Sequence, residues 1–205
     1  MTVLTHRGYP IHVITRHLKK RRVRDLYLGI MDRFGIGAFA GRNMAANILK
    51  TLKSGGVVGY VLDRNIQREH GVFVDFFGKK ACTARGLASL AGRNASPIVQ
   101  IFIRSDPSGR HRITVCEGFI PQGPKSLKDQ EERITQHYTT LIEEWIRRYP
   151  PQWVWFHSRW KTRPVGEPAI YPKRSRPIKR LGSRLSAKAM SIYNSMRRYL
   201  NKQRD

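Results

Sequence analysis

Three basic side chains in one short segment, Arg159, Lys161 and Arg163, have the composition of an anion-binding surface. Two tryptophans, Trp153 and Trp155, lie just upstream of them. Guanidinium and ammonium groups bind phosphates, and tryptophan favours the boundary between water and lipid. The three cations are therefore candidate substrate-binding residues, for a phosphate or a lipid headgroup. For Trp153 and Trp155 we favour the alternative, that they pack this segment onto the core.

A carboxylate at Asp63 follows the apolar run 57–62, which is typical of a buried strand in a parallel sheet. Open α/β sheets place their ligand sites beyond the carboxyl ends of their strands. Asp63 is therefore a candidate substrate-binding residue. The alternative is a structural role, in which Asp63 holds the following loop to the sheet.

The two cysteines, Cys82 and Cys116, are too few for a disulfide framework. Neither has an acid or base partner nearby in the sequence, so we do not expect a nucleophilic thiol. The chain also shows no spacing typical of metal ligands, and we expect no metal site.

The elements around these candidates alternate between strand and helix. We expect strands at residues 11–15, 57–62, 97–104 and 112–117, and helices at 23–34, 44–52, 83–92 and 127–149. Thr83 is the expected cap of its helix, and residues 63–80 are expected to be irregular. A helix, a glycine stop and a buried strand in that order indicate an α/β fold with a mostly parallel sheet flanked by helices.

The charge of the chain is strongly positive: 39 Lys and Arg residues face 14 Asp and Glu in 205 residues, a formal net charge of +25. Such a charge implies a polyanionic partner, which could be nucleic acid, an anionic membrane surface or a phosphorylated substrate. The longest apolar stretch, residues 95–103, is much shorter than the roughly 20 residues of a membrane span. We therefore expect any membrane contact by this chain to be peripheral.

The composition shifts after Pro164, which predicts a domain over residues 1–164 and a basic tail over 165–205. From about residue 182 the tail interleaves apolar and basic side chains. A helix lying on an anionic membrane leaflet fits this pattern, and a solvated tail is the alternative.

Three sequence blocks together resemble one enzyme family. They are the glycine–strand–acid block (residues 52–63), the Phe-Phe-Gly block (71–83) and the Trp-rich segment (150–164, PPQWVWFHSRWKTRP). Their order and spacing resemble the bacterial lipid A biosynthesis acyltransferases, the lauroyl and myristoyl transferases of late lipid A assembly. The resemblance covers roughly residues 11–164, and the Trp-rich segment is its most specific part.

The resemblance implies transfer of a fatty acyl chain from acyl carrier protein to a hydroxyl of a phosphorylated glucosamine lipid precursor. It implies no cofactor beyond the acyl-acyl carrier protein co-substrate, and a location at the cytoplasmic face of the inner membrane. Arg16 matches an arginine that, in the family, is thought to act near the acceptor phosphate or the oxyanion, so it is a candidate catalytic residue. The alternative for Arg16 is a solvated member of the basic run 16–24. Arg64 departs from the glutamine that commonly follows the acid in the family, which puts the hydrogen-bonding role of Asp63 in question.

The family's general base, a histidine with an acid after four intervening residues, is expected upstream of Ile11, and no such pair stands there in this sequence. His70 and Asp75 are the only pair with that spacing, but they fall inside the Phe-Phe-Gly block. We favour a loop histidine and a solvated aspartate as the interpretation of this pair. We therefore expect an N-terminally truncated domain, a fragment without turnover by itself.

Two other functions remain open. A basic nucleic-acid-binding module would use the net charge, but no recognised nucleic-acid motif is present, so nucleic acid is not the partner we expect. A non-catalytic remnant without a ligand is the third possibility.

Overall fold

The computed structural model describes residues 2–15, 18, 20–39, 43–121 and 127–172. Arg16 and the basic tail from residue 173 onward lie outside the described residues, so the expectations for both stay predictions. The chain as far as Tyr171 belongs to one compact unit.

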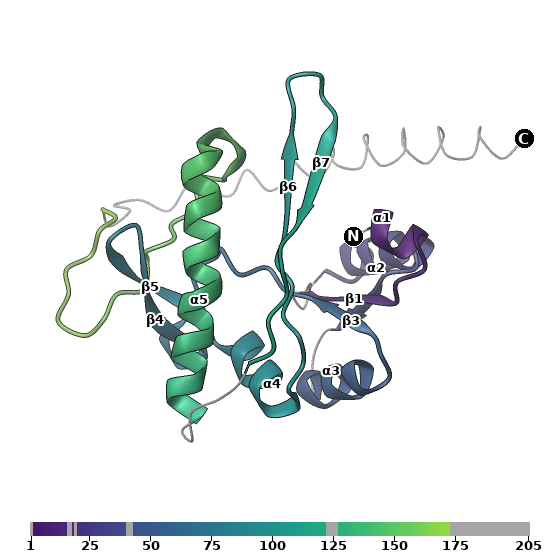
Figure 1. Cartoon of the computed structure of the whole chain (residues 1–205), viewed down its shortest axis with the longest axis horizontal. Helices are drawn as coiled ribbons and strands as arrows, with labels where there is room; N and C mark the ends of the chain where they lie inside the picture. The colour runs from purple at the N-terminus through teal and green to yellow at the C-terminus, as the bar shows by residue number, and fades with distance from the viewer. Residues whose placement is uncertain (1, 16–17, 19, 40–42, 122–126, 173–205) are drawn as a thin grey trace, which may run out of the picture. The chain divides into compact units, whose positions relative to one another are not determined.

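A three-stranded parallel sheet forms one part of this unit (Figure 1). Its central strand β1 (Ile11–Ile14) lies between β2 (Gly37–Phe39) and β3 (Val57–Gly59). Parallel strands need crossover connections. Helix α2 (Arg21–Arg33) connects β1 to β2, and helix α3 (Met44–Lys53) connects β2 to β3 on the other side of β1. A short helix, α1 (Thr2–His6), precedes the sheet. The predicted first strand and both crossover helices are confirmed within a residue or two.

Strands β4 (Gly71–Phe76) and β5 (Lys79–Ala84) form an antiparallel hairpin in a region that the sequence predicted to be irregular. Phe77 and Gly78 make its two-residue turn, with φ of +51° and +69°. Both angles match the turns that fit the twist of a hairpin, but phenylalanine is an unusual residue in the first of these positions. The turn therefore carried no recognisable sequence signal.

The predicted helix over 83–92 begins later than expected. Helix α4 spans Gly86–Asn94, and Thr83 lies buried in β5 instead of capping the helix. The prediction of Thr83 as a helix cap is wrong because the pairing of β5 with β4 continues as far as Ala84.

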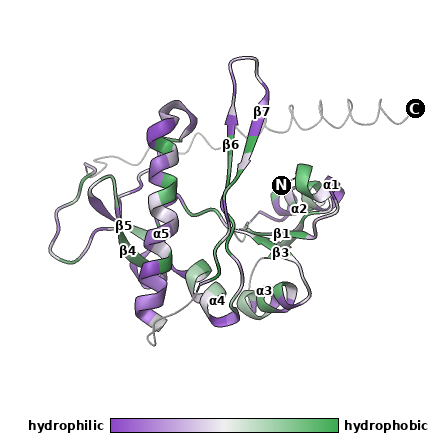
Figure 2. Ribbon diagram, viewed as in Figure 1, coloured by the Kyte–Doolittle hydropathy of each residue, from purple (hydrophilic) through white to green (hydrophobic). Residues whose placement is uncertain are grey.

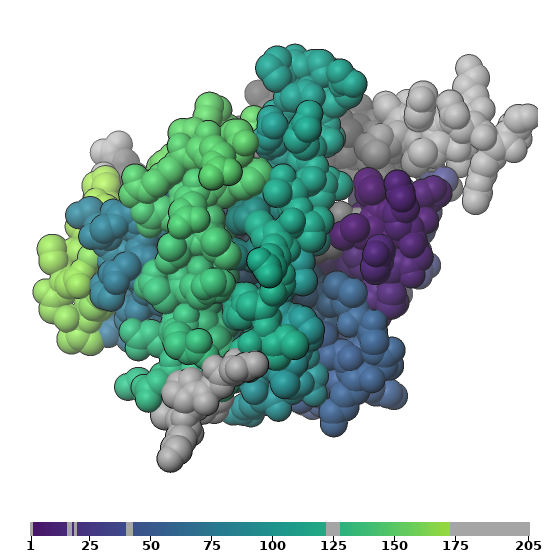
Figure 3. All heavy atoms as spheres, in the orientation of Figure 1, coloured from purple at the N-terminus to yellow at the C-terminus, as the bar shows by residue number. Residues whose placement is uncertain are grey.

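A second antiparallel hairpin, β6 (Ile101–Ser105) with β7 (His111–Val115), precedes the long helix α5 (Leu127–Arg148). Helix α5 stands between the two hairpins (Figure 1), and it packs against β4 and α4. The Phe102 ring stacks on Trp145 with centroids 4.6 Å apart, which fixes β6 to α5. The space-filling view shows α5 and the β6–β7 hairpin side by side on one face (Figure 3). Two short 3₁₀ turns, Arg68–His70 and Pro150–Gln152, complete the described elements.

Among the described residues the mixed α/β class is confirmed, and the prediction of a mostly parallel sheet is confirmed only for the three-stranded sheet. Only β1, β2 and β3 pair in parallel, whereas both hairpins are antiparallel two-stranded sheets. Strand β3 also ends at Gly59 instead of Leu62. Apolar residues cover β1 and β3 and extend to the base of β6 (Figure 2). The sequence predicted buried strands in these three places. None of the described helices has both the length and the apolar character needed to cross a membrane.

Candidate functional site

The three sequence blocks meet in space. Trp153 of the Trp-rich segment donates a hydrogen bond from Nε1 to Oδ2 of Asp63, at 2.9 Å, which joins that segment to the loop after β3. Trp160 donates from Nε1 to the backbone oxygen of Phe76 in β4, at 3.2 Å. The Phe76 ring, fully buried, lies between Trp153 and Trp160, with ring centroids 5.8 and 5.6 Å away. The Trp-rich segment therefore bridges the other two blocks.

Asn65 fastens the same loop to the Trp-rich segment at two further points. Its side-chain amide exchanges two hydrogen bonds with Thr162, to Oγ1 at 3.1 Å and from the backbone nitrogen at 3.0 Å. The Asn65 backbone N–H donates to Nε2 of His157 at 2.9 Å. The loop carrying Asp63 is therefore fixed from both ends of the Trp-rich segment.

Arg159 lies inside the structure, with 1% of its surface exposed. Its Nη1 donates to the backbone oxygen of Cys82 at 2.9 Å, and its Nη2 donates to Oγ1 of Thr83. The guanidinium carbon also lies 5.1 Å from the centroid of the Phe76 ring, a cation–π contact. Burial lowers the pKa of Arg159 to about 10, against the opposing charge of Asp63, so the group is still cationic at neutral pH. Arg159 therefore joins the Trp-rich segment to β5 inside the structure. Contact of Arg159 with substrate stays a prediction.

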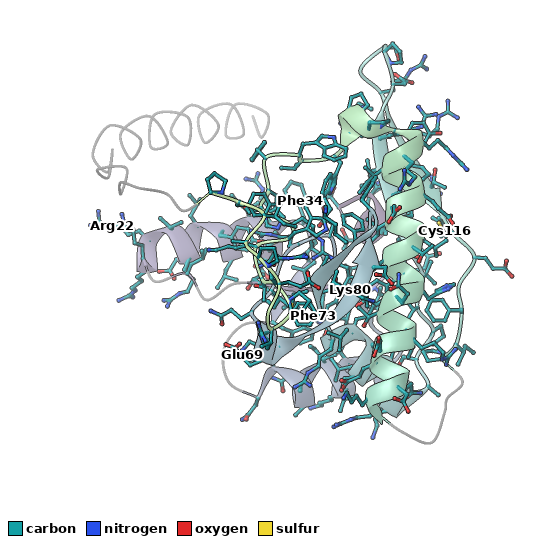
Figure 4. All side chains as sticks on the ribbon, turned by 90° about the vertical axis from the view of Figure 1, so that its left-hand side faces the viewer. Arg22, Phe34, Glu69, Phe73, Lys80 and Cys116 are labelled. Atoms are coloured by element: carbon teal, nitrogen blue, oxygen red, sulfur yellow. The ribbon has the colours of Figure 1, made fainter. Side chains whose placement is uncertain are left out.

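Arg163 and Lys161 have different surroundings from Arg159 and from each other. Arg163 donates from Nη1 to the backbone oxygen of Lys80 at 2.6 Å and forms an ion pair with Glu167. It thereby holds the Trp-rich segment against the edge of the β4–β5 hairpin that carries Lys80 (Figure 4). Lys161 is exposed. The three cations that the sequence placed on one surface thus divide into one buried, one half-buried and one exposed side chain.

An apolar cavity of about 780 Å³ opens beside Asp63. Its walls come from β3 and the residues after it, from α3, α4 and β6, and from the C-terminal part of α5, and they include Ile48, Leu52, Leu87, Ile98, Ile101 and Ile142. Asp63 and Trp153 lie at its lining together with Tyr60, whose pKa burial raises to about 12. The volume falls within the range of roughly 300–1,000 Å³ that is usual for small-molecule sites. The arrangement can enclose an aliphatic chain and offers a carboxylate and a phenol as polar groups.

The β4–β5 hairpin contributes no side chain to the lining of this cavity. It supports the cavity indirectly, because Phe76 packs against Trp153, which does line it. The structure brings the three blocks together, but the Phe-Phe-Gly block packs against the wall of the cavity and does not line it.

The sequence analysis missed the pairing of Asn65, His157 and Thr162, although two of these residues lie inside the Trp-rich segment. Asn65 lies just after the glycine–strand–acid block, and polar side chains in loops are usually solvated, so no sequence signal indicated this pairing.

His70 and Asp75 do not form a catalytic pair. Asp75 lies in the extended strand β4 and His70 directly precedes that strand, which separates them by about 16 Å at 3.3 Å per residue. The Asp75 carboxylate instead accepts a hydrogen bond from Nζ of Lys80 at 3.1 Å. The interpretation of this pair as a loop histidine and a solvated aspartate agrees with that geometry.

The Cys82 thiol is buried next to this region. Burial raises its pKa, against the charges of Arg159 and Arg68, so the neutral thiol is favoured over the nucleophilic thiolate. Cys116 lies on the opposite side of α5 from Lys80 (Figure 4).

The His157 imidazole should titrate at a lower pH than a free histidine. Burial and the nearby charge of Arg64 both lower its pKa from the usual 6.5, and its Nε2 accepts a hydrogen bond only when unprotonated. The unfolded chain then binds a proton at His157 below about pH 6.5 that the folded chain does not bind, so stability is expected to fall as the pH drops below 6.5.

This expectation is checked by following the His157 ring signals in an NMR titration, with His157→Gln used to assign them. We expect a midpoint below 6.5, and a smaller loss of stability on acidification in His157→Gln than in the unchanged chain. A midpoint at or above 6.5 would contradict the assigned role of the Asn65 N–H.

The chain matches a known enzyme family over most of its length. The model of the family "Bacterial lipid A biosynthesis acyltransferase" matches residues 1–162. The chain is 30% identical over 137 residues to a lipid A biosynthesis palmitoleoyltransferase of Escherichia coli (strain K12), which covers 65% of this chain and 43% of that protein. It is 30% identical over 125 residues to the lipid A biosynthesis lauroyltransferase of the same strain, with coverage of 60% and 40%. A lipid A biosynthesis acyltransferase of Haemophilus influenzae is 25% identical over 166 residues, covering 80% of this chain and 50% of its own length. The matches thus span half or less of each of these relatives.

Proposed function

The chain belongs to the bacterial lipid A biosynthesis acyltransferase family, and we propose that it acts in the transfer of a fatty acyl chain from acyl carrier protein to a hydroxyl of a phosphorylated glucosamine lipid precursor. The observation that carries this proposal is the contact between Asp63 and Trp153 at the lining of the apolar cavity. It joins two of the sequence blocks of the family at a place where an aliphatic chain and a polar headgroup would meet.

In this proposal the cavity holds the fatty chain. Its aliphatic walls gain free energy from each methylene group that leaves water, about 0.8 kcal/mol per group. A chain that enters with its thioester end outermost would bring the reacting carbonyl near Asp63 and Tyr60. Tyr60 is a hydrogen-bond donor at neutral pH because its pKa lies far above 7.

The phosphorylated acceptor would bind outside the cavity. Lys161 is exposed and suited to a phosphate, and Arg16 is the further candidate that the family resemblance implies. Arg159 and Arg163 act in this proposal by holding the Trp-rich segment in place, because both Nη groups of Arg159 and the Nη1 of Arg163 donate to β5.

The general base is the part of the chemistry to which the described residues assign no group. His157 binds a backbone N–H, and His111 pairs with the hydroxyl of Ser105, so neither has the carboxylate partner that orients a catalytic imidazole. We therefore expect this chain to bind its substrates but not to turn them over by itself. In this proposal it acts as a peripheral protein at the cytoplasmic face of the inner membrane.

Binding and turnover are measured separately to test the proposal. The purified chain is titrated with lauroyl-acyl carrier protein and with a phosphorylated, acylated glucosamine disaccharide, and acyl transfer between the two is followed with a radiolabelled lauroyl group. We expect saturable binding of both and transfer no faster than in the absence of protein.

Failure to bind either substrate would overturn the proposed function. Transfer well above the control without protein would support the function but contradict the expected lack of turnover. In that case, His70→Ala shows whether the separated His70 and Asp75 take part, and we expect no change.

A further inference from the structure

The most exposed large apolar side chains of the Trp-rich segment are consecutive. Val154, Trp155 and Phe156 are 49%, 51% and 93% exposed. Phenylalanine is usually among the buried residue types, so a side chain that is almost wholly in water needs an explanation. We call residues 154–156 the insertion tip.

The conformation of the insertion tip is held by specific contacts. Trp155 donates from Nε1 to the backbone oxygen of Pro150 at 2.7 Å, and its ring contacts Phe77 and Trp153 edge to face, with centroids 6.0 and 4.7 Å away. The His157 backbone N–H donates to the oxygen of Val154 at 3.2 Å, which closes a turn around Phe156. Because the turn is braced in this way, Phe156 is presented to solvent by a fixed scaffold.

Arginines border the insertion tip. The guanidinium carbon of Arg147 lies 4.6 Å from the centroid of the Phe77 ring, which itself contacts Trp155. The charge of Arg147 is paired, because its Nε and Nη2 donate to Oε1 of Glu143 at 2.9 and 2.6 Å. The charge of Arg64 is close enough to His157, the residue after the tip, to lower the pKa of that imidazole. An apolar projection with cations around its base is the arrangement by which peripheral proteins enter an anionic membrane surface.

We propose that the insertion tip enters an anionic lipid bilayer, with Phe156 among the acyl chains and Arg64 among the headgroup phosphates. The inference deepens the proposed function and rests on it, because it names the surface on which the substrate is met. The net charge of +25 complements such a surface. Trp153, next to the tip, both lines the cavity and binds Asp63, so insertion would bring the polar groups of the cavity close to the bilayer.

Flotation of the full chain with phosphatidylglycerol-containing vesicles tests this proposal, using Phe156→Ser against the matched variant Phe34→Ser. Phe34, which follows helix α2, is an exposed phenylalanine, at 51%, that lies outside the tip. Both substitutions are at exposed positions and should leave the fold intact. We expect Phe156→Ser to weaken partitioning by about tenfold or more, Phe34→Ser to change it little, and the unchanged chain to bind phosphatidylcholine vesicles more weakly than anionic ones.

A second readout follows the protein directly. The tryptophan emission of the unchanged chain should shift to shorter wavelength on addition of anionic vesicles, because Trp155 leaves water, and this shift should be smaller in Phe156→Ser. Equal vesicle binding by Phe156→Ser and Phe34→Ser would overturn the proposal. So would a preference for duplex DNA over anionic vesicles at the same salt concentration.

The two proposals can fail independently. Binding of lauroyl-acyl carrier protein is measured in the absence of lipid, where Phe156→Ser should bind as the unchanged chain does. Retained binding with no vesicle effect would overturn the insertion tip alone. Loss of acyl carrier protein binding in the unchanged chain would overturn the proposed function.

Discussion

Replacing Arg159 with alanine is expected to lower the free energy of unfolding by about 3–5 kcal/mol. The substitution removes the donor to the hydroxyl of Thr83 and leaves the backbone oxygen of Cys82 with only the longer bond from the Ile66 N–H, at 3.4 Å. Both acceptors lie in the interior. It also opens a space under the Phe76 ring, which loses its cation–π contact. Lost hydrogen bonds to buried acceptors and a newly formed cavity each destabilise a fold, and here they occur together.

Urea unfolding of the variants measures this loss, with Lys161→Ala as the matched control. Lys161 lies two residues away in the same segment but is exposed, so its substitution should change stability by no more than about 0.5 kcal/mol. Arg159→Lys should fall between the two, because an ammonium group keeps the charge but lacks the planar fork of donors that serves two acceptors at once. A loss below about 1 kcal/mol in Arg159→Ala would show that Arg159 does not support the site.

The sequence predicted β1, α3 and α5 well because their signals are local. The apolar run that forms β1, the glycine stop after α3 and the spacing of apolar side chains on α5 each report one element without reference to another. The β4–β5 hairpin was missed because its evidence is pairwise. Val74 opposite Ala81 is a strand pair only after the chain has turned at Phe77 and Gly78.

The site was predicted in its parts and not in its arrangement. The alternation of Arg159, Lys161 and Arg163 suggested that they share a surface, as they would on a strand. The segment is irregular, however, and the hydrogen bonds of Thr162 to Asn65 turn it so that Arg159 faces β5 and Lys161 faces solvent. Burial of a charged side chain depends on acceptors from a distant strand, which no local pattern specifies.

The apolar cavity has a different origin from the polar contacts beside it. Along β6, Phe102 stacks on Trp145 of α5, and both rings line the cavity together with Ile101 and Ile103. Because Ile101 and Ile103 alternate with Phe102 along the strand, either can be enlarged without displacing the stack of Phe102 on Trp145. Enlarging one of them should therefore change the space for a fatty chain and little else.

Ile101→Trp is accordingly expected to weaken binding of a lauroyl chain by roughly sixtyfold, because the larger ring takes the place of about three methylene groups at about 0.8 kcal/mol each. Ile101 is 41% exposed and lines the cavity, whereas Ile113, 37% exposed on the paired strand β7, does not. Ile113→Trp is therefore the matched control and should bind the chain as before. The measurement is displacement of a fluorescent fatty acid by laurate, repeated with hexanoate, whose shorter chain should discriminate less between the two variants. Equal affinities of Ile101→Trp and Ile113→Trp for laurate would place the fatty chain outside this cavity, because only Ile101 lines it.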